Sequence, residues 1–491
     1  MFEAVELGRK LSKPEYGAEL PDLRTGLLEA QQSIRKAGLP VVILIAGMDG
    51  AGKGTVVHRL NEWLDPRGID THTFWNVSGE EQERPYYWRF WRTLPARGRI
   101  GIYYGGWYAD VLLGRVERRY DTGRLEHELA RIAALERMLA EDGALILKFW
   151  FHLSRRDQQR RFKGLMRDPD KHQVLLPYNR KHLRWHGRFV AAAEEVIRRT
   201  DTGTARWHLV EATQSRYRDL TTGRLVLEAL RAGVDRQAKA PPPSRRKPAP
   251  ERRPSVTVLD RVDLDQQLTS EVYGAELKKL QVKLNRLAWK AHRRRISSIL
   301  VFEGWDAAGK GSAIRRVTEA VDARLFRVVP VAAPTQEELA QHYLWRFWRH
   351  LPRAGLVTVF DRSWYGRVLV ERVEGLASRE AWSRAYHEIN EFESQLTDHG
   401  TVLLKFWIHI SAEEQLQRFK KREQVAHKQY KITPEDWRNR RQWGAYELAV
   451  HDLVTRTSTS TAPWMLVAGN DKRFARIEIL RTFCRALDRA L

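Results

Sequence analysis

The sequence has a single cysteine, Cys484, and no long apolar run. One thiol cannot form an internal disulfide framework or a zinc site with several thiolate ligands, so we expect Cys484 to be a small buried residue in a reducing compartment. The longest apolar run, residues 41–46, is too short to cross a bilayer. Residues 1–16 are charged and lack the apolar core of a signal peptide. These absences predict a soluble, cytoplasmic protein.

Acidic residues are scarce relative to basic ones. The chain has 85 Lys and Arg but 61 Asp and Glu, which gives a net charge of +24. This excess indicates a polyanionic partner, which on charge alone is a nucleic acid, an acidic membrane surface or a multiply phosphorylated substrate. The share of hydrophobic residues, 43%, is typical of a globular protein, and 491 residues suffice for two or three domains.

The chain contains an internal duplication. The segment Tyr-Gly-Ala-Glu-Leu at 16–20 recurs at 273–277, an offset of 257 positions, and the same offset relates two Trp-Arg-Phe-Trp-Arg segments at 88–92 and 345–349. Between the copies, residues 241–250 are rich in proline and predict a semi-rigid, solvated linker. The predicted domains are therefore an N-terminal domain, a linker and a C-terminal domain at residues 1–235, 236–260 and 261–491.

Each copy has the pattern of an α/β domain. In the second copy, helical patterns at 312–321 and 377–397 alternate with short apolar runs at 298–302, 326–329, 356–360, 402–410 and 464–467. Near-continuous apolar strands separated by helices favour a parallel sheet with both faces covered, and ligands then lie at the carboxyl ends of the strands. The predicted fold is a tandem duplication of this α/β unit.

A glycine-rich loop follows the first strand of each copy. In the second copy the loop is Gly304-Trp305-Asp306-Ala307-Ala308-Gly309-Lys310-Gly311-Ser312, and a helix follows, as a P-loop (Walker A motif) requires. Its glycines let backbone N–H groups converge on phosphate oxygens, and Lys310 adds a full positive charge. Phosphate binding is predicted for Gly304, Gly309, Lys310, Gly311 and Ser312. The first copy has a similar loop at 47–55, with Asp49 and Lys53.

Asp361 ends the third apolar run of the second copy, where a Walker B aspartate holds Mg²⁺ beside a P-loop. An aspartate at a strand end is commonly only a turn residue. Here Arg362 and Arg367 follow it, and two guanidinium groups can clamp phosphate charge in a transition state. Together with Lys310 in the loop, these residues predict a P-loop kinase.

The first copy lacks this second motif. At the offset of 257, the carboxylate and both guanidinium groups are replaced by Tyr104, Gly105 and Asp110. Without them this copy is predicted to be catalytically silent. Its intact loop either binds an anion or persists only as scaffold, and the residues alone leave both possibilities open.

A strongly basic stretch follows residues 402–410. Its cations include Arg418, Lys421, Arg422 and Lys428. Such a stretch is commonly a solvated helix face, but here it occupies the place of a lid that closes over a P-loop site, so polyanion binding is predicted for these four residues. The Trp-Arg-Phe-Trp-Arg segments could stack nucleic-acid bases, but the spacing of Trp345 and Trp348 is more typical of a buried helix face.

Four segments of the second copy resemble the polyphosphate kinase 2 family. They are the loop at 304–311, the string Phe-Asp-Arg-Ser-Trp-Tyr-Gly-Arg at 360–367, Glu-Ile-Asn-Glu-Phe-Glu at 388–393 and Lys-Phe-Trp-Ile-His-Ile-Ser at 405–411. The resemblance covers nearly all of both copies, although the first copy has Arg131, Ala133 and Leu135 in place of Glu388, Asn390 and Phe392. These departures strengthen the expectation of a silent first copy.

The resemblance implies phosphoryl transfer between inorganic polyphosphate and nucleotides with Mg²⁺ as cofactor, and two-domain members look like the class that makes ADP from AMP. It implies that Lys310, Arg362 and Arg367 contact the transferring phosphates, that Asp306 and Asp361 hold Mg²⁺ or orient the acceptor, and that the basic stretch is the lid. The alternatives are use of ADP or GDP as acceptor, an ATP-dependent nucleoside monophosphate kinase, and a basic nucleic-acid-binding protein with vestigial P-loops.

The gap-free equivalence of the copies also suggests that they pack as an intramolecular pseudo-dimer.

Overall fold

The computed structural model describes residues 1–74, 77–167, 183–239, 254–425 and 432–491. The chain divides into two compact units. Unit 1 comprises Met1–Val77, Arg89–Pro241 and Gln336–His342, and unit 2 comprises Ser78–Trp88, Pro242–Thr335 and Tyr343–Leu491. Residues 240–253 of the predicted linker lie outside the described residues, and the predicted domain boundaries stay predictions.

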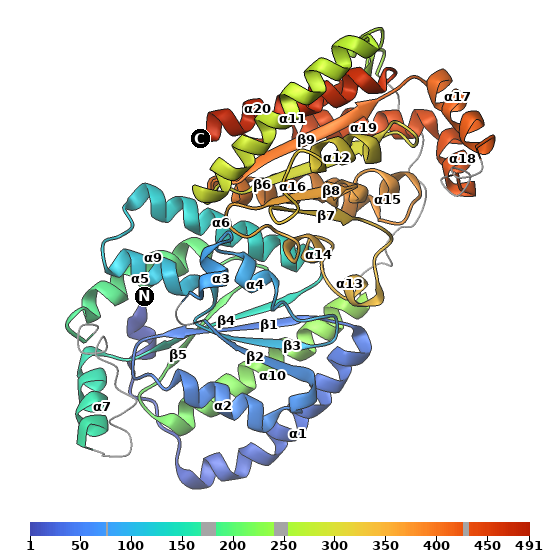
Figure 1. Cartoon of the computed structure of the whole chain (residues 1–491). Coiled ribbons are helices and arrows are strands. Elements are labelled where there is room, and N and C mark those ends of the chain that lie inside the picture. Colours follow the sequence, from blue (N-terminus) through green and yellow to red (C-terminus); the bar gives the residue numbers. More distant parts are fainter. Residues whose placement is uncertain (75–76, 168–182, 240–253, 426–431) are drawn as a thin grey trace. The chain divides into compact units, whose positions relative to one another are not determined.

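Unit 1 is built on a five-stranded parallel sheet with the strand order β2-β3-β1-β4-β5. Its strands are β1 (Val41–Gly47), β2 (Ile69–Thr73), β3 (Ile100–Tyr104), β4 (Leu145–His152) and β5 (Trp207–Glu211). In Figure 1 the helices of this unit lie on both faces of the sheet. The longer ones are α1 (Lys13–Ala37), α2 (Lys53–Trp63), α5 (Ala109–Val116), α6 (Thr122–Glu141), α7 (Arg155–Arg167), α9 (His186–Thr200) and α10 (Ser215–Lys239).

Unit 2 repeats this architecture, with the strand order β10-β9-β6-β8-β7. Its strands are β6 (Ser298–Gly304), β7 (Phe326–Pro330), β8 (Val357–Asp361), β9 (Val402–His409) and β10 (Trp464–Ala468). Its longer helices are α11 (Ser270–Arg293), α12 (Lys310–Thr318), α16 (Arg379–Asp398), α17 (Ala412–Glu423), α18 (Pro434–Arg441), α19 (Trp443–Thr457) and α20 (Lys472–Ala490). The predicted fold of two α/β copies is confirmed.

The register of the sheet brings the predicted motifs together. Phe302 of β6 lies opposite Asp361 of β8 on one side and Phe406 of β9 on the other. Because parallel strands end at the same edge, the loop after β6 and the carboxylate that ends β8 are neighbours. The sequence predicts this third strand at 356–360, and in the structure β8 ends one residue later, at Asp361 itself.

Each sheet buries one lysine in its fourth strand along the chain. Lys405 Nζ donates to Glu393 Oε2 at 2.7 Å and to the Thr457 carbonyl at 2.7 Å. Lys148 makes the same two bonds with Glu136 and Thr200 in unit 1. A buried charge is tolerated only when it is paired and hydrogen-bonded. Because both copies keep this network, it belongs to the fold and not to the chemistry of one copy.

The Trp-Arg-Phe-Trp-Arg segment of the second copy forms the short helix α14 (Trp345–Trp348), and both tryptophans are buried. This confirms a packing role for them and argues against base stacking. Cys484 is also buried, as predicted. Across the described ranges, no helix is both long and apolar enough to span a membrane.

Candidate functional site

The loop between β6 and α12 has the geometry of a phosphate cradle. Gly304 has φ +146°, and a Cβ on it would lie 2.5 Å from the Ile408 carbonyl oxygen, so no other residue fits there. Lys310, the first residue of α12, donates from Nζ to the carbonyls of Gly304 at 2.6 Å and Trp305 at 3.1 Å. Burial lowers the pKa of Lys310, and the nearby Asp306 carboxylate opposes that shift.

The rest of the loop is tied together locally. The Ser312 hydroxyl donates to the Gly309 carbonyl at 2.8 Å, whereas a Cβ on Gly311 would meet open space. Gly309 itself has φ +112° and is the N-cap of the helix. The N-terminus of α12, whose positive dipole end favours anions, thus borders the loop, as the motif requires.

A pocket opens at this loop. It brings together four of the residues predicted from sequence, namely Gly304, Asp306, Lys310 and Arg362. Apolar and aromatic side chains form another part of its wall, among them Leu369, Val370, Trp407 and Tyr446. A charged end next to an apolar wall suits a ligand that has a phosphate and an aromatic base.

Asp306 is the most contacted carboxylate of the pocket. Its Oδ2 accepts a hydrogen bond from Asn439 Nδ2 at 2.9 Å, and its Oδ1 lies 3.4 Å from Arg362 Nη2. Tyr446 OH in turn donates to Asn439 Oδ1 at 3.2 Å. Asp306 is thus held between the residue that follows β8 and the helices α18 and α19. A movement of that residue or of these helices would change the surroundings of the carboxylate.

The two predicted guanidinium groups have different settings. Arg362 has φ +64°, a conformation that non-glycine residues rarely adopt, and its side chain is 55% exposed. Such backbone strain concentrates at functional sites. Arg367 Nη1 instead pairs with Glu371 Oε2 at 2.9 Å, and its guanidinium carbon lies 4.5 Å from the ring centroid of Tyr343. Arg362 therefore lines the pocket, while Arg367 is held at its side.

Of the four basic residues predicted for the lid, Arg418 is buried in α17. Its guanidinium donates to the carbonyls of Ala307 and Ala308 in the loop and to those of Gly469 and Asn470 before α20. We therefore infer that Arg418 supports the loop and does not contact a phosphate chain directly. Lys421 is exposed, Arg422 is half-buried, and Lys428 lies outside the described residues.

The prediction from sequence missed two features of the pocket. Glu303, the residue before Gly304, is buried and accepts a hydrogen bond from Ser363 Oγ at 2.8 Å. The indole of Trp305 stacks on that of Trp443 from α19, with ring centroids 3.7 Å apart. Comparison of the copies could have revealed both, because the first copy has Ala46 and Met48 at the positions of Glu303 and Trp305.

Replacing Glu303 by glutamine is expected to raise the free energy of unfolding at pH 7. Burial raises the pKa of Glu303, although Lys310 opposes the shift. The folded state thus holds this proton more tightly than the unfolded chain, so ionisation above the unfolded pKa costs stability. Denaturant unfolding from pH 4 to 8 should show a gap between variant and wild type that opens as the pH rises. A gap that is constant with pH would contradict this assignment.

The equivalent site of unit 1 has lost most of these features. Lys53 donates to the carbonyls of Gly47 and Met48 as Lys310 does to its loop, but it also lies 3.7 Å from Asp49 Oδ1. Burial, and to a smaller extent the nearby Asp49 charge, raises the pKa of Tyr104 to about 12. A neutral phenol thus stands where unit 2 has the Asp361 carboxylate.

The remaining two positions of that site are also changed. Gly105 has φ +89°, so this position keeps a positive φ, as at Arg362, without the guanidinium group. The Asp110 carboxylate accepts hydrogen bonds from Tyr120 at 2.5 Å and Arg119 at 3.2 Å. It adds negative charge where unit 2 has Arg367, which disfavours a phosphate ligand.

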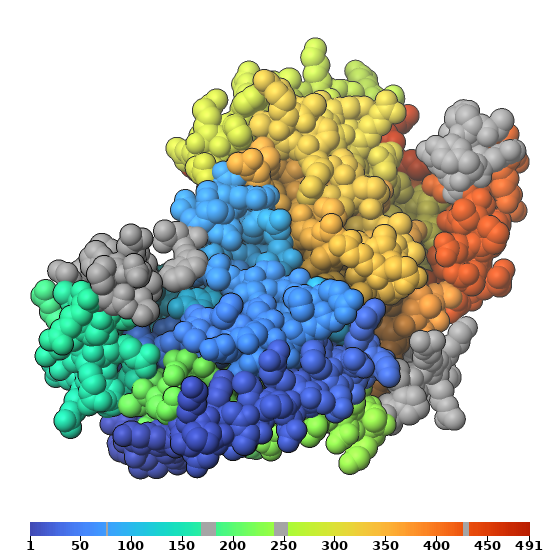
Figure 2. All heavy atoms as spheres, turned by 90° about the horizontal axis from the view of Figure 1, so that it is seen from below, coloured from blue at the N-terminus to red at the C-terminus, as the bar shows by residue number. Residues whose placement is uncertain are grey.

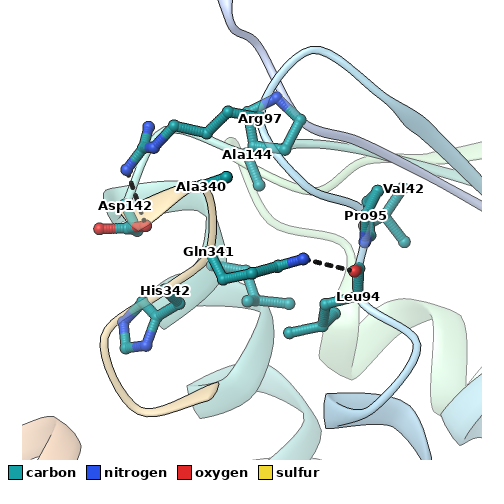
Figure 3. A pocket seen from close by; sticks show the side chains of 11 residues that line it. Val42, Leu94, Pro95, Arg97, Asp142, Ala144, Ala340, Gln341 and His342 are labelled. Atoms are coloured by element: carbon teal, nitrogen blue, oxygen red, sulfur yellow. Dashed lines mark hydrogen bonds and ion pairs between the residues drawn. The ribbon is translucent and has the colours of Figure 1, made fainter. Parts of the chain in front are cut away.

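A second pocket lies within unit 1 and has a different character (Figure 3). Its wall includes Val42, Leu94 and Pro95, and Gln341 Nε2 donates to the Leu94 carbonyl at 3.2 Å. Arg97, which also lines the pocket, is paired with Asp142 at 3.3 Å. No residue of the phosphate loop lines this pocket, so it is not a second copy of the site.

The fold and the site define a phosphotransferase of the P-loop kinase class. Comparison with known proteins is more specific: the family model "Polyphosphate kinase 2 (PPK2)" matches residues 10–238 and 267–491. The chain therefore belongs to the polyphosphate kinase 2 family, with one family domain in each half.

Relatives match the whole chain. A polyphosphate:AMP phosphotransferase of Pseudomonas aeruginosa is 48% identical over 491 residues, which is 100% of this chain and 99% of that protein. One from Acinetobacter johnsonii is 36% identical and covers 95% of both chains. A crystal structure described as a polyphosphate kinase 2 from Pseudomonas aeruginosa PA01 has a TM-score of 0.90 and 47% identity, covering 100% of this chain and 99% of that one.

Proposed function

We propose that this protein is a polyphosphate:AMP phosphotransferase, which transfers a phosphoryl group from inorganic polyphosphate to AMP and releases ADP. The observation that carries this conclusion is the match along the full length to relatives of that activity, with both domains present in each. The pocket of unit 2 agrees with it, because the loop, the carboxylates of Glu303 and Asp306 and the Arg362 guanidinium converge there beside an apolar wall. The net charge of +24 suits a long polyanionic donor.

We further propose that unit 2 performs the transfer. Lys310 supplies a full positive charge to the transferring phosphoryl group, and Arg362 balances the charge that develops on its oxygens. Arg367 contributes positive charge from the side of the pocket. Asp306 orients the accepting phosphate through its contacts with Arg362 and Asn439. The stacked pair Trp305–Trp443 excludes water from one wall.

The residues present fit Mg²⁺ as cofactor. Within the described ranges no group of three or more His, Cys, Asp or Glu side chains could hold a metal ion. Mg²⁺ does not need such a cage, because it is usually bound by one or two carboxylates together with substrate phosphates and water. Asp361 and Asp306 would hold it, and when bound it would neutralise charge on the phosphate oxygens.

In this proposal unit 1 is catalytically silent, since a phenol, a glycine and a carboxylate replace the three residues of the second motif. We also propose that the two copies pack as an intramolecular pseudo-dimer, which their gap-free equivalence supports. Small-angle scattering that shows two separated lobes would contradict this packing. The cytoplasmic location stays a prediction from sequence.

A donor and acceptor screen tests the function directly. With polyphosphate as donor and Mg²⁺ present, the purified protein should convert AMP to ADP without ATP, and chelation of divalent ions should stop the reaction. GMP, ADP and GDP are the competing acceptors, and ATP is the competing donor. ADP formation from ATP but not from polyphosphate would identify an ordinary nucleoside monophosphate kinase. Salt-sensitive DNA binding without turnover of any nucleotide would instead favour a nucleic-acid-binding protein.

A further inference from the structure

Ser363 connects the second motif of unit 2 to the strand that leads into the phosphate loop. Its hydroxyl donates to Glu303 Oε1 at 2.8 Å and accepts from the backbone N–H of Tyr365 at 3.3 Å. Both Ser363 and Glu303 are buried. A buried hydroxyl that bridges a carboxylate and a backbone N–H restricts the course of the chain between them. The turn that begins after Asp361 is therefore held from the side of β6.

This turn carries Arg362 in a strained conformation. Arg362 has φ +64°, and Ser363 directly after it has φ −157° and ψ −163°. The backbone N–H of Arg362 donates to the carbonyl of Phe302, the residue before Glu303, at 3.1 Å. A left-handed conformation costs an arginine free energy, so it persists only where the surrounding structure imposes it. The hydrogen bonds to residues 302 and 303 supply that constraint.

The guanidinium group of Arg362 has little else to fix its direction. Its side chain is 55% exposed, and among the described residues its one hydrogen bond is to Asp306 Oδ1 at 3.4 Å. Asp306 in turn is bonded to Asn439 of α18. All residues of α18 are at least partly exposed, and the helix lies at the surface of unit 2, drawn in orange in Figure 2. The direction of the guanidinium group therefore depends on the backbone turn from which its side chain starts.

Unit 1 keeps the backbone hydrogen bond of this turn although it has no arginine there. The Gly105 N–H donates to the Ile45 carbonyl at 3.2 Å, and these residues are equivalent to Arg362 and Phe302. The fold thus retains this bond whether or not a guanidinium group is present.

The side-chain pair, by contrast, is absent from unit 1. Ala46 stands at the position of Glu303, and Gly106 stands at that of Ser363. Gly106 has φ +51°, so the chain takes a different course there from the extended conformation of Ser363. The pair therefore accompanies the guanidinium group and is not a requirement of the fold.

We propose that Ser363 and Glu303 are positioning residues for phosphoryl transfer and act through Arg362. Their hydrogen bond holds the turn so that the guanidinium group meets the oxygens of the transferring phosphoryl group, where charge develops in the transition state. This inference rests on the proposed function and assigns the two residues a role that requires no contact with substrate. Loss of the pair lowers kcat, whereas the KM values for AMP and polyphosphate change little.

Ser363→Ala should lower kcat for ADP formation by about a hundredfold, the cost of a misplaced catalytic group, with both KM values within about threefold of wild type. In the background Arg362→Gly, the same change should lower kcat by less than about a further threefold, because the group that Ser363 positions is already gone. Ser378→Ala is the matched control. Ser378 also caps a helix, where it accepts from the Ala381 N–H at 3.2 Å, and its loss should leave kcat unchanged.

Two variants of Glu303 separate its hydrogen bond from its charge. Glu303→Ala should lower kcat as much as Ser363→Ala does, and unit 1 shows that the fold accepts alanine at this position. Glu303→Gln keeps an oxygen that can accept from Ser363 Oγ, so kcat should stay within about tenfold of wild type. Equal losses in the two Glu303 variants would overturn the proposal. An undiminished effect of Ser363→Ala in the Arg362→Gly background would also overturn it, because Ser363 would then act without the guanidinium group.

Amide hydrogen exchange of the full chain without substrate distinguishes this inference from the proposed function. Exchange at residues 362–366 should be faster in Glu303→Ala than in wild type or Glu303→Gln, because the turn has lost its support from β6. Unchanged exchange there would overturn the positioning role even if the protein makes ADP. If the wild type makes no ADP from AMP and polyphosphate, the proposed function fails. The exchange measurement then still shows whether the pair holds the turn, and the kinetic comparison is made with the donor and acceptor that the protein does use.

Discussion

Replacing Asp361 by asparagine should lower kcat for ADP formation by about a thousandfold, with little change in the free energy of unfolding. Asp361 ends β8 directly opposite Phe302, and its charge acts on Lys310 of the phosphate loop. Asparagine has nearly the same shape but no charge, and it therefore removes the proposed Mg²⁺ ligand without disturbing the strand. Steady-state assays with saturating AMP, polyphosphate and Mg²⁺ measure the effect.

The first copy offers the matched control for this variant. Tyr104 stands at the position of Asp361, and Tyr104→Phe should leave kcat within about twofold of wild type, because we propose that unit 1 is catalytically silent. Comparable losses in the two variants would show that unit 1 takes part in the reaction. Raising the Mg²⁺ concentration should partly rescue Asp361→Asn if the lost group is a metal ligand.

Replacing Arg362 by glycine should have opposite effects on activity and stability. We expect kcat to fall by about a thousandfold, the usual cost of losing an arginine that balances charge in phosphoryl transfer. The free energy of unfolding should rise by about 1 kcal/mol, because the φ of +64° at this residue is strained for arginine and free for glycine. Activity assays and denaturant unfolding on the same preparation measure both.

Gly105→Ala is the mirror experiment in unit 1. Gly105 has φ +89°, so alanine there should lower the free energy of unfolding by about 1 kcal/mol or more while kcat stays near that of wild type.

A loss of both activity and stability in Arg362→Gly would show that the arginine holds the turn together. That result would contradict a role for Arg362 in which backbone strain is tolerated for catalysis.

Much of the fold followed from local patterns. The near-continuous apolar runs around residues 299 and 357 predicted parallel strands because both faces of such a sheet are covered. Element ends were less accurate: the helix predicted at 312–321 spans Lys310–Thr318, since it begins at the lysine of the loop itself. The buried Lys405–Glu393 pair could not be inferred, because nothing local in the sequence of β9 or α16 says which partner completes it.

The sequence by itself determined the duplication, the two phosphate loops and the loss of the second motif from the first copy, because these depend on residue identity at fixed spacing. Only the tertiary structure decided which charged groups meet: it gave Glu303 its place in the pocket, turned Arg418 toward backbone carbonyls and set Lys472 beside the loop. These residues are far apart in the chain, and their roles depend on burial and on the direction of each side chain. Long-range packing sets the burial and the direction of each side chain, and neither can be read from the spacing of residues along the sequence.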